Sequence, residues 1–234
     1  MVAEFPHKQT DDRHPPFEQF TIAACIWLLE ELGVHYEIKH YERDPKTMLA
    51  PMSLLKVHPL GKSPVITDGE ITVAESGAII EYLIDSYDIE RKLAPPLNTP
   101  TRLRYTYWLH FAEGSAMSPL LMKLVFSQVE KAPMPFFAKP IAKAIAKNVK
   151  ASFIDPQIKA HLDFVESELE KSTWLAGGRL TGADIQMSFP LEIAVALGII
   201  DENHPRIMAF LKRIHGRAGY KRALECGGEY SLLS

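Results

Sequence analysis

The chain has 234 residues, of which 47% are hydrophobic and 24% are charged, a mixture that is ordinary for a globular protein. Its 26 Lys and Arg residues stand against 29 Asp and Glu residues, and the net charge of −3 argues against a nucleic-acid-binding scaffold, which is usually markedly basic. No apolar run is long enough to span a bilayer, so we expect no transmembrane helix. The first residues lack the apolar core of a secretory signal and the two cysteines form no disulfide framework, so we expect a reduced, cytoplasmic protein of two small domains.

The first part of the chain has the pattern of a small α/β domain, which we expect at residues 22–87. Residues 1–21 begin with a polar, proline-containing stretch, and we interpret them as an atypical N-terminal segment. An apolar run at residues 22–32 predicts a helix that Gly33 ends, and residues 34–41 then predict a strand.

A short helix is predicted at residues 48–57, and a β-hairpin follows it. Two β-branched runs flank Asp68-Gly69, and an Asp-Gly pair in this setting is the strongest short hairpin signal. A further helix begins at Glu75 and ends near Tyr87. We therefore expect the order helix, strand, helix, hairpin, helix, in an α/β layer whose first strand is atypical or missing.

The rest of the chain is helical in pattern. Residues 88–100 are rich in proline and predict a linker, and residues 101–234 predict an all-helical domain. Thr181-Gly-Ala-Asp184 has the pattern of a capping box, which starts a helix. The helices are expected at residues 101–128 (with a bend at Pro119), 135–150, 155–171, 181–197, 205–215 and 220–224.

Five stretches carry a resemblance to a known family. They are Trp-Leu-Leu-Glu-Glu-Leu-Gly (27–33), His-Pro-Leu-Gly-Lys-Ser-Pro-Val-Ile (58–66), Ala-Glu-Ser-Gly-Ala-Ile-Ile-Glu-Tyr-Leu (74–83), Met-Pro-Phe (134–136) and Leu-Thr-Gly-Ala-Asp-Ile-Gln-Met-Ser-Phe-Pro (180–190). In this order they resemble the cytosolic glutathione transferases, and the nearest branch is the fungal one that includes the baker's-yeast enzymes. The resemblance implies a thioredoxin-like N-terminal domain, an all-helical C-terminal domain and a homodimer.

The resemblance also implies a glutathione site at Lys62, Ser63, Pro64, Glu75 and Ser76. In the family, the proline at the position of Pro64 follows a cis peptide bond, and the backbone before it pairs like a strand with the cysteinyl backbone of glutathione. An ordinary trans turn is the alternative. The free N–H groups at a helix N-terminus favour an anion, so Ser76 suits the γ-glutamyl carboxylate and Glu75 the ligand's ammonium group. A plain helix cap is the alternative there, and Lys62 either faces the glycyl carboxylate or is a solvated surface lysine.

The position of the catalytic hydroxyl departs from the family pattern. A free thiol is only a few per cent thiolate at neutral pH, so the family uses a hydroxyl or a cysteine before the first helix to stabilise the sulfur anion. Here that position falls on Phe20, which cannot donate a hydrogen bond, and Thr21 beside it is the candidate replacement. We interpret Cys25, in an apolar run, as a core residue. Either the first strand is rebuilt, or the residues before about position 22 derive from another coding segment.

Two further features belong to the helical half. In the family the first long helix of this half walls the pocket for the electrophile, which makes Tyr107 and Phe111 the candidates for that pocket. Lysines at positions 139, 143, 147 and 150 form a basic stripe, which is either a solvated helix face or a contact with an anionic membrane surface. The nine histidines show no metal-binding spacing, so we expect no metal.

The sequence thus predicts a glutathione transferase. Glutathione would be a co-substrate, with no bound cofactor, and its thiolate would attack a hydrophobic electrophile, with peroxide reduction as a side activity. The alternative is a non-catalytic module that binds glutathione, an apolar ligand or a protein partner, because Phe20 stands at the usual position of the hydroxyl.

Overall fold

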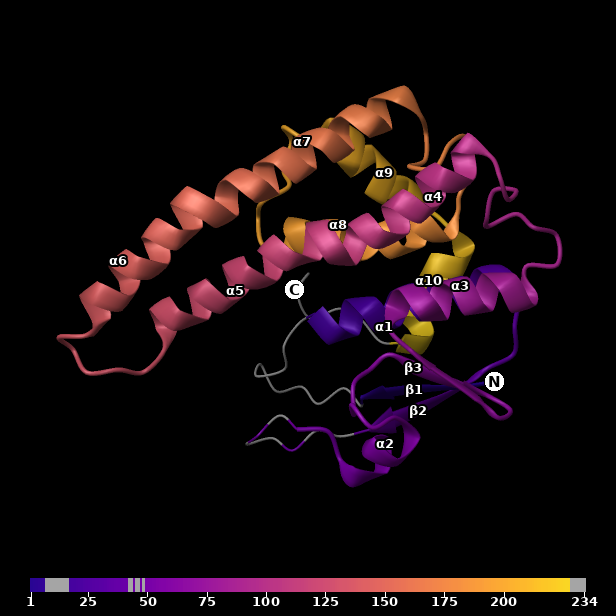
Figure 1. Ribbon diagram of the computed structural model, residues 1–234, viewed down its shortest axis with the longest axis horizontal. Coiled ribbons are helices and arrows are strands. Elements are labelled where there is room, and N and C mark those ends of the chain that lie inside the picture. The colour runs from indigo at the N-terminus through magenta and orange to yellow at the C-terminus, as the bar shows by residue number, and fades with distance from the viewer. Residues whose placement is uncertain (7–16, 42–43, 45–46, 48, 228–234) are drawn as a thin grey trace.

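The computed structural model describes residues 1–6, 17–41, 44, 47 and 49–227, with the backbone alone for residues 2–6, 17–21 and 227. A small sheet lies at one side of the molecule, and helices α1 and α3 cover one face of it (Figure 1). The helices of the second half pack beyond α1 and α3, whereas α2 lies on the other side of the sheet. No helix among the described residues combines the length and the apolar character that crossing a bilayer requires. The two halves predicted from the sequence are therefore layered against each other through α1 and α3.

The sheet has four strands in the order β2-β1-β3-β4. The first strand is present: β1 runs parallel to β2 and antiparallel to β3, so it lies inside the sheet. The sequence of β1 does not predict a strand, because five residues that end in a proline are too few for a periodic signal. The pairing with β2 and β3 decides its conformation. The strands are β1 (Val2–Pro6), β2 (Glu37–Tyr41), β3 (Val65–Asp68) and β4 (Ile71–Ala74).

The predicted hairpin is confirmed. β3 and β4 pair in register from Val65 with Ala74 to Asp68 with Ile71. Gly69 in the turn has a φ of +59°, a conformation that glycine adopts without steric cost.

Helix α1 (Phe17–Leu32) is the central element between the two halves. It begins five residues earlier than expected, directly after the sequence Pro15-Pro16. Its residues 25–29 are wholly buried, and it packs against α3, α8 and α10. Glu31 of α1 accepts two hydrogen bonds of 2.7 Å from the Arg217 guanidinium, which fixes α1 to the C-terminal helices. The other helices of this half are α2 (Met52–Val57) and α3 (Ser76–Tyr87).

The long helix expected at residues 101–128 is divided by a π-helical segment, η1 (Ala112–Met117). This widened turn precedes Pro119, whose ring would clash with a carbonyl of the preceding turn in a regular α-helix. Hydrogen bonding also adjusts here, since the Ser118 hydroxyl donates to the Gly114 carbonyl at 3.1 Å. The elements on either side are α4 (Pro100–Phe111) and α5 (Ser118–Lys131).

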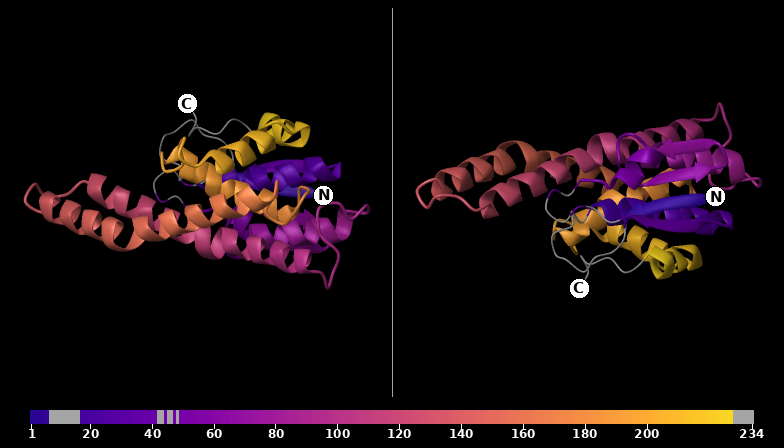
Figure 2. Two further views of the ribbon diagram at one scale, coloured as in Figure 1. Left: turned by 90° about the horizontal axis from the view of Figure 1, so that it is seen from above. Right: turned by 90° about the horizontal axis from the view of Figure 1, so that it is seen from below.

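Two long α-helices, three shorter ones and a second π-helical segment complete the described part of the helical half. The predicted ranges 155–171 and 205–215 are confirmed to the residue by α7 and α9. The elements are α6 (Lys139–Val149), a π-helical segment η2 (Lys150–Ile154), α7 (Asp155–Lys171), α8 (Gly182–Ala196), α9 (Pro205–His215) and α10 (Ala218–Gly227). The helices α5 and α6 extend beyond the rest of the molecule as a hairpin in every view (Figures 1 and 2).

Helix α8 is buried along almost its whole length, and the predicted capping box at its start is confirmed. The buried Asp184 carboxylate accepts hydrogen bonds of 2.8 Å from the Thr181 N–H, the Thr181 hydroxyl and the Leu175 N–H. A Cβ on Gly182 would lie 2.5 Å from the Ile84 side chain of α3, so only glycine permits this approach of the two helices. The capping box therefore places the start of α8 against the α/β half.

Replacing Asp184 by alanine tests this arrangement. The change leaves three buried donors without their acceptor, so we expect the free energy of unfolding to fall by about 3 kcal/mol. Urea denaturation followed by circular dichroism measures it. As a control, Asp163→Ala removes an exposed carboxylate paired with Lys159, and we expect a loss below about 0.5 kcal/mol. Equal losses in the two variants would contradict this role of the capping box.

Candidate functional site

A polar pocket of about 140 Å³ lies where the loop before β3, the start of α3 and the segment η1 meet. It brings together all five residues that the sequence predicted for ligand binding, together with two ionisable residues from elsewhere. The lining residues are His58, Leu60, Lys62, Ser63, Pro64, Ala74, Glu75, Ser76 and Glu113.

One wall of the pocket is the loop that enters β3. The peptide bond between Ser63 and Pro64 is cis, as predicted. Pro64 is buried, Ser63 is half-buried and Lys62 is exposed. The Lys62 side chain is therefore the cation of this pocket and lies at its solvent side.

The opposite wall is the N-terminus of α3. Glu75, which precedes the helix, has a φ of +71°, a region that non-glycine residues rarely occupy and that costs about 1–3 kcal/mol. Ser76, the first helical residue, is buried. Because the first N–H groups of a helix lack partners within it and point along the axis, this end of α3 favours a negatively charged group in the pocket.

Ser76 belongs to a hydrogen-bonded triad that spans the two halves of the molecule. Its hydroxyl donates to Oε1 of Glu113 at 3.1 Å. The Gln186 amide, on α8 and 1% exposed, donates to the Ser76 hydroxyl oxygen and to Oε1 of Glu113, both at 2.8 Å. Gln186 thus engages one lone pair of the Ser76 oxygen, which favours donation of the hydroxyl proton toward an acceptor.

The triad was only partly visible in the sequence. Glu113 lies on the helix predicted to line the electrophile pocket, but nothing indicated its contact with Ser76. Gln186 is separated from Ser76 by 110 positions along the chain. The one signal was its polar side chain in the mostly apolar run that follows the capping box, where a buried amide needs a partner.

The electrostatics of the pocket combine two carboxylates with one helix N-terminus. Burial raises the pKa of the Glu113 carboxyl, and the charge of Glu75 also raises it, while the hydrogen bonds from Ser76 and Gln186 lower it. A ligand ammonium group near Glu75 and Glu113 would relieve their repulsion, and a ligand carboxylate would suit the start of α3. The arrangement therefore suits a zwitterionic amino-acid group.

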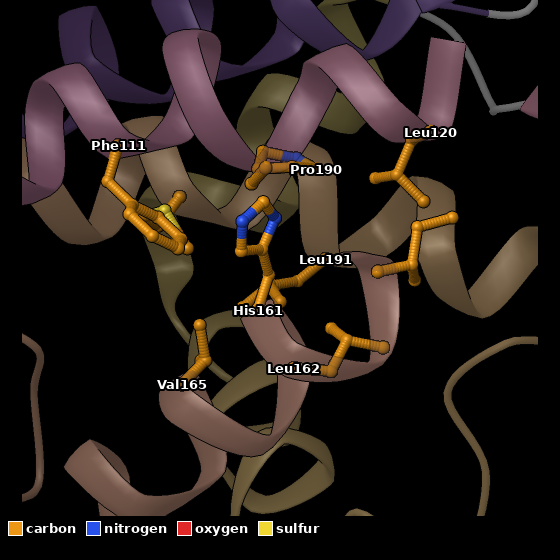
Figure 3. A pocket seen from close by; sticks show the side chains of 10 residues that line it. Phe111, Leu120, His161, Leu162, Val165, Pro190 and Leu191 are labelled. Atoms are coloured by element: carbon orange, nitrogen blue, oxygen red, sulfur yellow. The ribbon is translucent and has the colours of Figure 1, made fainter. Parts of the chain in front are cut away.

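Tyr107 and Phe111, the predicted wall of the electrophile pocket, lie outside this polar pocket. Tyr107 is 48% exposed on α4, and its ring packs 5.6 Å from that of Phe111. Phe111 lines a separate cavity between α5, α7 and α8, beside His161 and Pro190 (Figure 3). That cavity measures about 10 Å³, room for at most one water molecule. The cavity that Phe111 lines is therefore too small for an electrophile.

Thr21 and Cys25 are the two residues that the sequence offers for a role at the glutathione sulfur, and the structure describes only the second side chain. Thr21 is the fifth residue of α1, but its side chain, like that of Phe20, lies outside the described residues, so its catalytic role stays a prediction. Cys25 is fully buried, and burial together with the charge of Glu113 raises the pKa of its thiol to about 12. The interpretation of Cys25 as a core residue is confirmed by its place in the buried hydrophobic cluster.

Comparison with known proteins identifies the fold. Residues 17–85 match the family described as glutathione S-transferase, N-terminal domain, and residues 129–218 match glutathione S-transferase, C-terminal domain. Glutathione S-transferase 1 of Saccharomyces cerevisiae is 34% identical over 208 residues, which cover 86% of this chain and 88% of the relative. The chain belongs to the glutathione S-transferase family. Glutathione S-transferase 3 of Schizosaccharomyces pombe, 31% identical over 86% of this chain and 81% of the relative, places it with the fungal members.

Solved structures agree with this assignment. A glutathione S-transferase from Actinobacillus pleuropneumoniae superposes with a TM-score of 0.72 at 31% identity, covering 99% of this chain and 95% of that one. A glutathione transferase from Phanerochaete chrysosporium, solved in complex with oxidized glutathione, gives a TM-score of 0.73 at 25% identity over 97% of this chain and 95% of that one. The α/β half is thus the thioredoxin-like N-terminal domain of the family, and the helical half is its C-terminal domain.

Thiol alkylation tests the assignment of Cys25. In the native protein we expect iodoacetamide to modify the exposed Cys226 and to leave the buried Cys25 unmodified, since the thiolate is the reacting species. Mass spectrometry of tryptic peptides measures both sites, and denatured protein modified at both is the control. Rapid modification of Cys25 in the native protein would contradict the assignment.

Proposed function

We propose that this glutathione transferase binds glutathione in the pocket at Ser76 and transfers its thiolate to hydrophobic electrophiles. The observation that carries the proposal is that the five residues predicted for glutathione binding line one pocket at the start of α3. The solved relative that holds oxidized glutathione supports the same ligand class.

The charges of the pocket support one orientation of the ligand. The γ-glutamyl carboxylate would lie at the N-terminus of α3 and accept a hydrogen bond from Ser76, whose hydroxyl would turn from Glu113 to the ligand. The ammonium group would lie between Glu75 and Glu113, and Lys62 would face the glycyl carboxylate. The backbone of Ser63, before the cis proline, would pair with the cysteinyl unit.

The transfer step needs the ionised thiol. The thiol proton leaves to solvent, the sulfur forms a bond to the electrophilic carbon, and the leaving group departs with its electron pair. A donor near the sulfur favours the thiolate, and one unit of pKa corresponds to about 1.4 kcal/mol. We propose Thr21 as that donor, and Tyr107 and Phe111 as apolar contacts for the electrophile after a rearrangement of their rings.

Reduction of a hydroperoxide by two glutathione thiols, giving an alcohol, water and glutathione disulfide, is the proposed side activity.

A non-catalytic glutathione-binding module is the second candidate, because Phe20 stands where the family places its hydroxyl. Turnover separates the two. Conjugation of glutathione to a model aromatic halide, saturable in glutathione and faster than the uncatalysed reaction, supports the enzyme. Binding of glutathione without turnover, across a panel of electrophiles, would support the module.

We also propose a homodimer in the cytoplasm, with a linker at residues 88–100 between the two domains. Exposed apolar side chains on each domain, among them Ile71 of β4 at 48% and Leu103 of α4 at 73%, support such an interface. Light scattering coupled to gel filtration measures the mass in solution.

Replacing Ser76 by alanine tests the binding site directly. The change removes a donor to a charged carboxylate, so we expect the Kd for glutathione to rise about tenfold to a hundredfold. Isothermal titration calorimetry measures it on folded protein. Ser167→Ala, on the exposed side of α7, is the control and should leave the Kd unchanged. An unchanged Kd in Ser76→Ala would remove Ser76 from the site.

The pH dependence of binding tests the triad. Glu113 can hold an ammonium group only when ionised, and its pKa is raised, so glutathione affinity should fall as the pH drops through that raised pKa. Gln186→Leu removes a hydrogen bond that lowers this pKa, so the fall should begin at a higher pH, and the affinity at pH 7 should drop about tenfold.

Two controls accompany this measurement. Glu113→Gln should abolish this acidic limb of the binding curve, and Gln128→Leu, an exposed change on α5, should leave the curve as in the wild type. The same acidic limb in Glu113→Gln as in the wild type would show that another group titrates.

A further inference from the structure

The hairpin of α5 and α6 carries an unusual distribution of charge. We call residues 118–154, which comprise α5, the connecting loop, α6 and η2, the arm. The arm projects from the helical domain, and its tip lies far from the sheet in each of the views (Figures 1 and 2). From Lys131 to Ile154 the sequence has five lysines and no Asp or Glu, in a chain whose net charge is −3.

Four of these lysines are available to a partner. Lys150 pairs with Glu130 at 2.8 Å near the base of the outer segment. The other four are exposed, and within the part of the chain that the structure describes they make no ion pair: Lys131, Lys139, Lys143 and Lys147. The last three are spaced four residues apart on α6, so they form a stripe along one side of the helix.

The tip of the arm is wholly apolar. The connecting loop, residues 132–138, reads Ala-Pro-Met-Pro-Phe-Phe-Ala and has no side chain that can donate a hydrogen bond. Phe136 is 88% exposed and Phe137 is 66% exposed, at the far end of the molecule from the core. Exposed aromatic side chains on a projecting loop indicate a surface that is covered in use.

The backbone of the loop is also suited to an apolar environment. Its two prolines lack an N–H group, which removes two donors that would otherwise need partners. The N–H groups of Ala132, Ala138 and Lys139 donate to carbonyls within the arm, at 2.9, 2.9 and 3.3 Å. The two prolines and these bonds therefore reduce the number of backbone donors that would need a partner when the loop enters a lipid interface.

We propose that the arm is a peripheral membrane contact, in which Phe136 and Phe137 enter the interface of a bilayer and the free lysines bind anionic headgroups. An extended basic stripe beside an apolar tip is complementary to a lipid surface, where negative charge lies in a plane above hydrocarbon. The tip has no polar side chains that could form specific hydrogen bonds with an acidic protein partner. This contact is independent of the Ser76 pocket and would hold that pocket near hydrophobic compounds dissolved in the bilayer.

Vesicle sedimentation with the full chain tests the proposal. We expect the protein to partition at least about tenfold more strongly onto vesicles of phosphatidylcholine mixed with phosphatidylserine than onto phosphatidylcholine alone. The preference should weaken as the salt concentration rises, because salt screens the lysine charges. Equal partition onto both kinds of vesicle, or none onto either, would overturn the proposal.

Two variants separate the apolar and the charged contributions. Phe136→Ser with Phe137→Ser should lower partition onto the mixed vesicles at least about tenfold. Lys139→Gln, Lys143→Gln and Lys147→Gln together should abolish the preference for the anionic lipid. The matched controls are Ile89→Ser, which changes a side chain 92% exposed elsewhere, and Lys212→Gln with Lys221→Gln, which changes exposed lysines on α9 and α10.

A measurement of mass distinguishes lipid from a second copy of the chain. The phenylalanine variant should keep the circular dichroism spectrum and the mass of the wild type, as measured by light scattering. If that variant loses its oligomeric state while vesicle binding is unchanged, a second protein molecule covers the tip and the proposal is wrong.

Discussion

The contact between the start of α8 and helix α3 is the constraint on which both the fold and the site depend. The Gly182 N–H donates to the Leu93 carbonyl at 2.9 Å, and a side chain at Gly182 would collide with α3. The buried Asp184 carboxylate accepts hydrogen bonds from two backbone N–H groups and one hydroxyl, so the start of α8 has one defined position. From that position Gln186, one turn into the helix, reaches Ser76 in the other domain.

The polar pocket is a consequence of this docking. Ser76 and Glu75 come from the thioredoxin-like domain, whereas Glu113 and Gln186 come from the helical domain, so the site exists only when the domains are packed together. The strained backbone of Glu75 and the buried carboxylate of Glu113 are both unfavourable in the free protein. Such features are concentrated where a ligand binds. A ligand ammonium group would compensate the negative charge of Glu113, and a carboxylate on the same ligand would suit the N-terminus of α3.

Local patterns allowed much of the fold to be predicted from the sequence. The hairpin follows from Asp68-Gly69, the start of α8 from its capping box, and α7 and α9 from their periodic apolar residues. The residues proposed to bind glutathione could be predicted because the family motifs that contain them lie close to these local signals. Each of these features is decided by residues that are neighbours in the chain.

The features that escaped prediction are decided by distant neighbours. The strand β1 is a strand because β2 and β3 pair with it on both sides, and its own five residues carry no such information. The π-helical turn at η1 depends on how the region before Pro119 packs. The contact of Gln186 with Ser76 requires that the two domains be docked. A polar residue in a mostly apolar helix predicts a buried hydrogen bond, but it does not identify the partner residue.

The central claim is that glutathione occupies the pocket at the start of α3. A crystal structure of the protein grown with saturating glutathione tests it most directly. The account predicts the γ-glutamyl carboxylate within hydrogen-bonding distance of the Ser76 hydroxyl and the ligand ammonium group beside Glu113. Glutathione bound elsewhere on the chain, with this pocket unchanged, would contradict it.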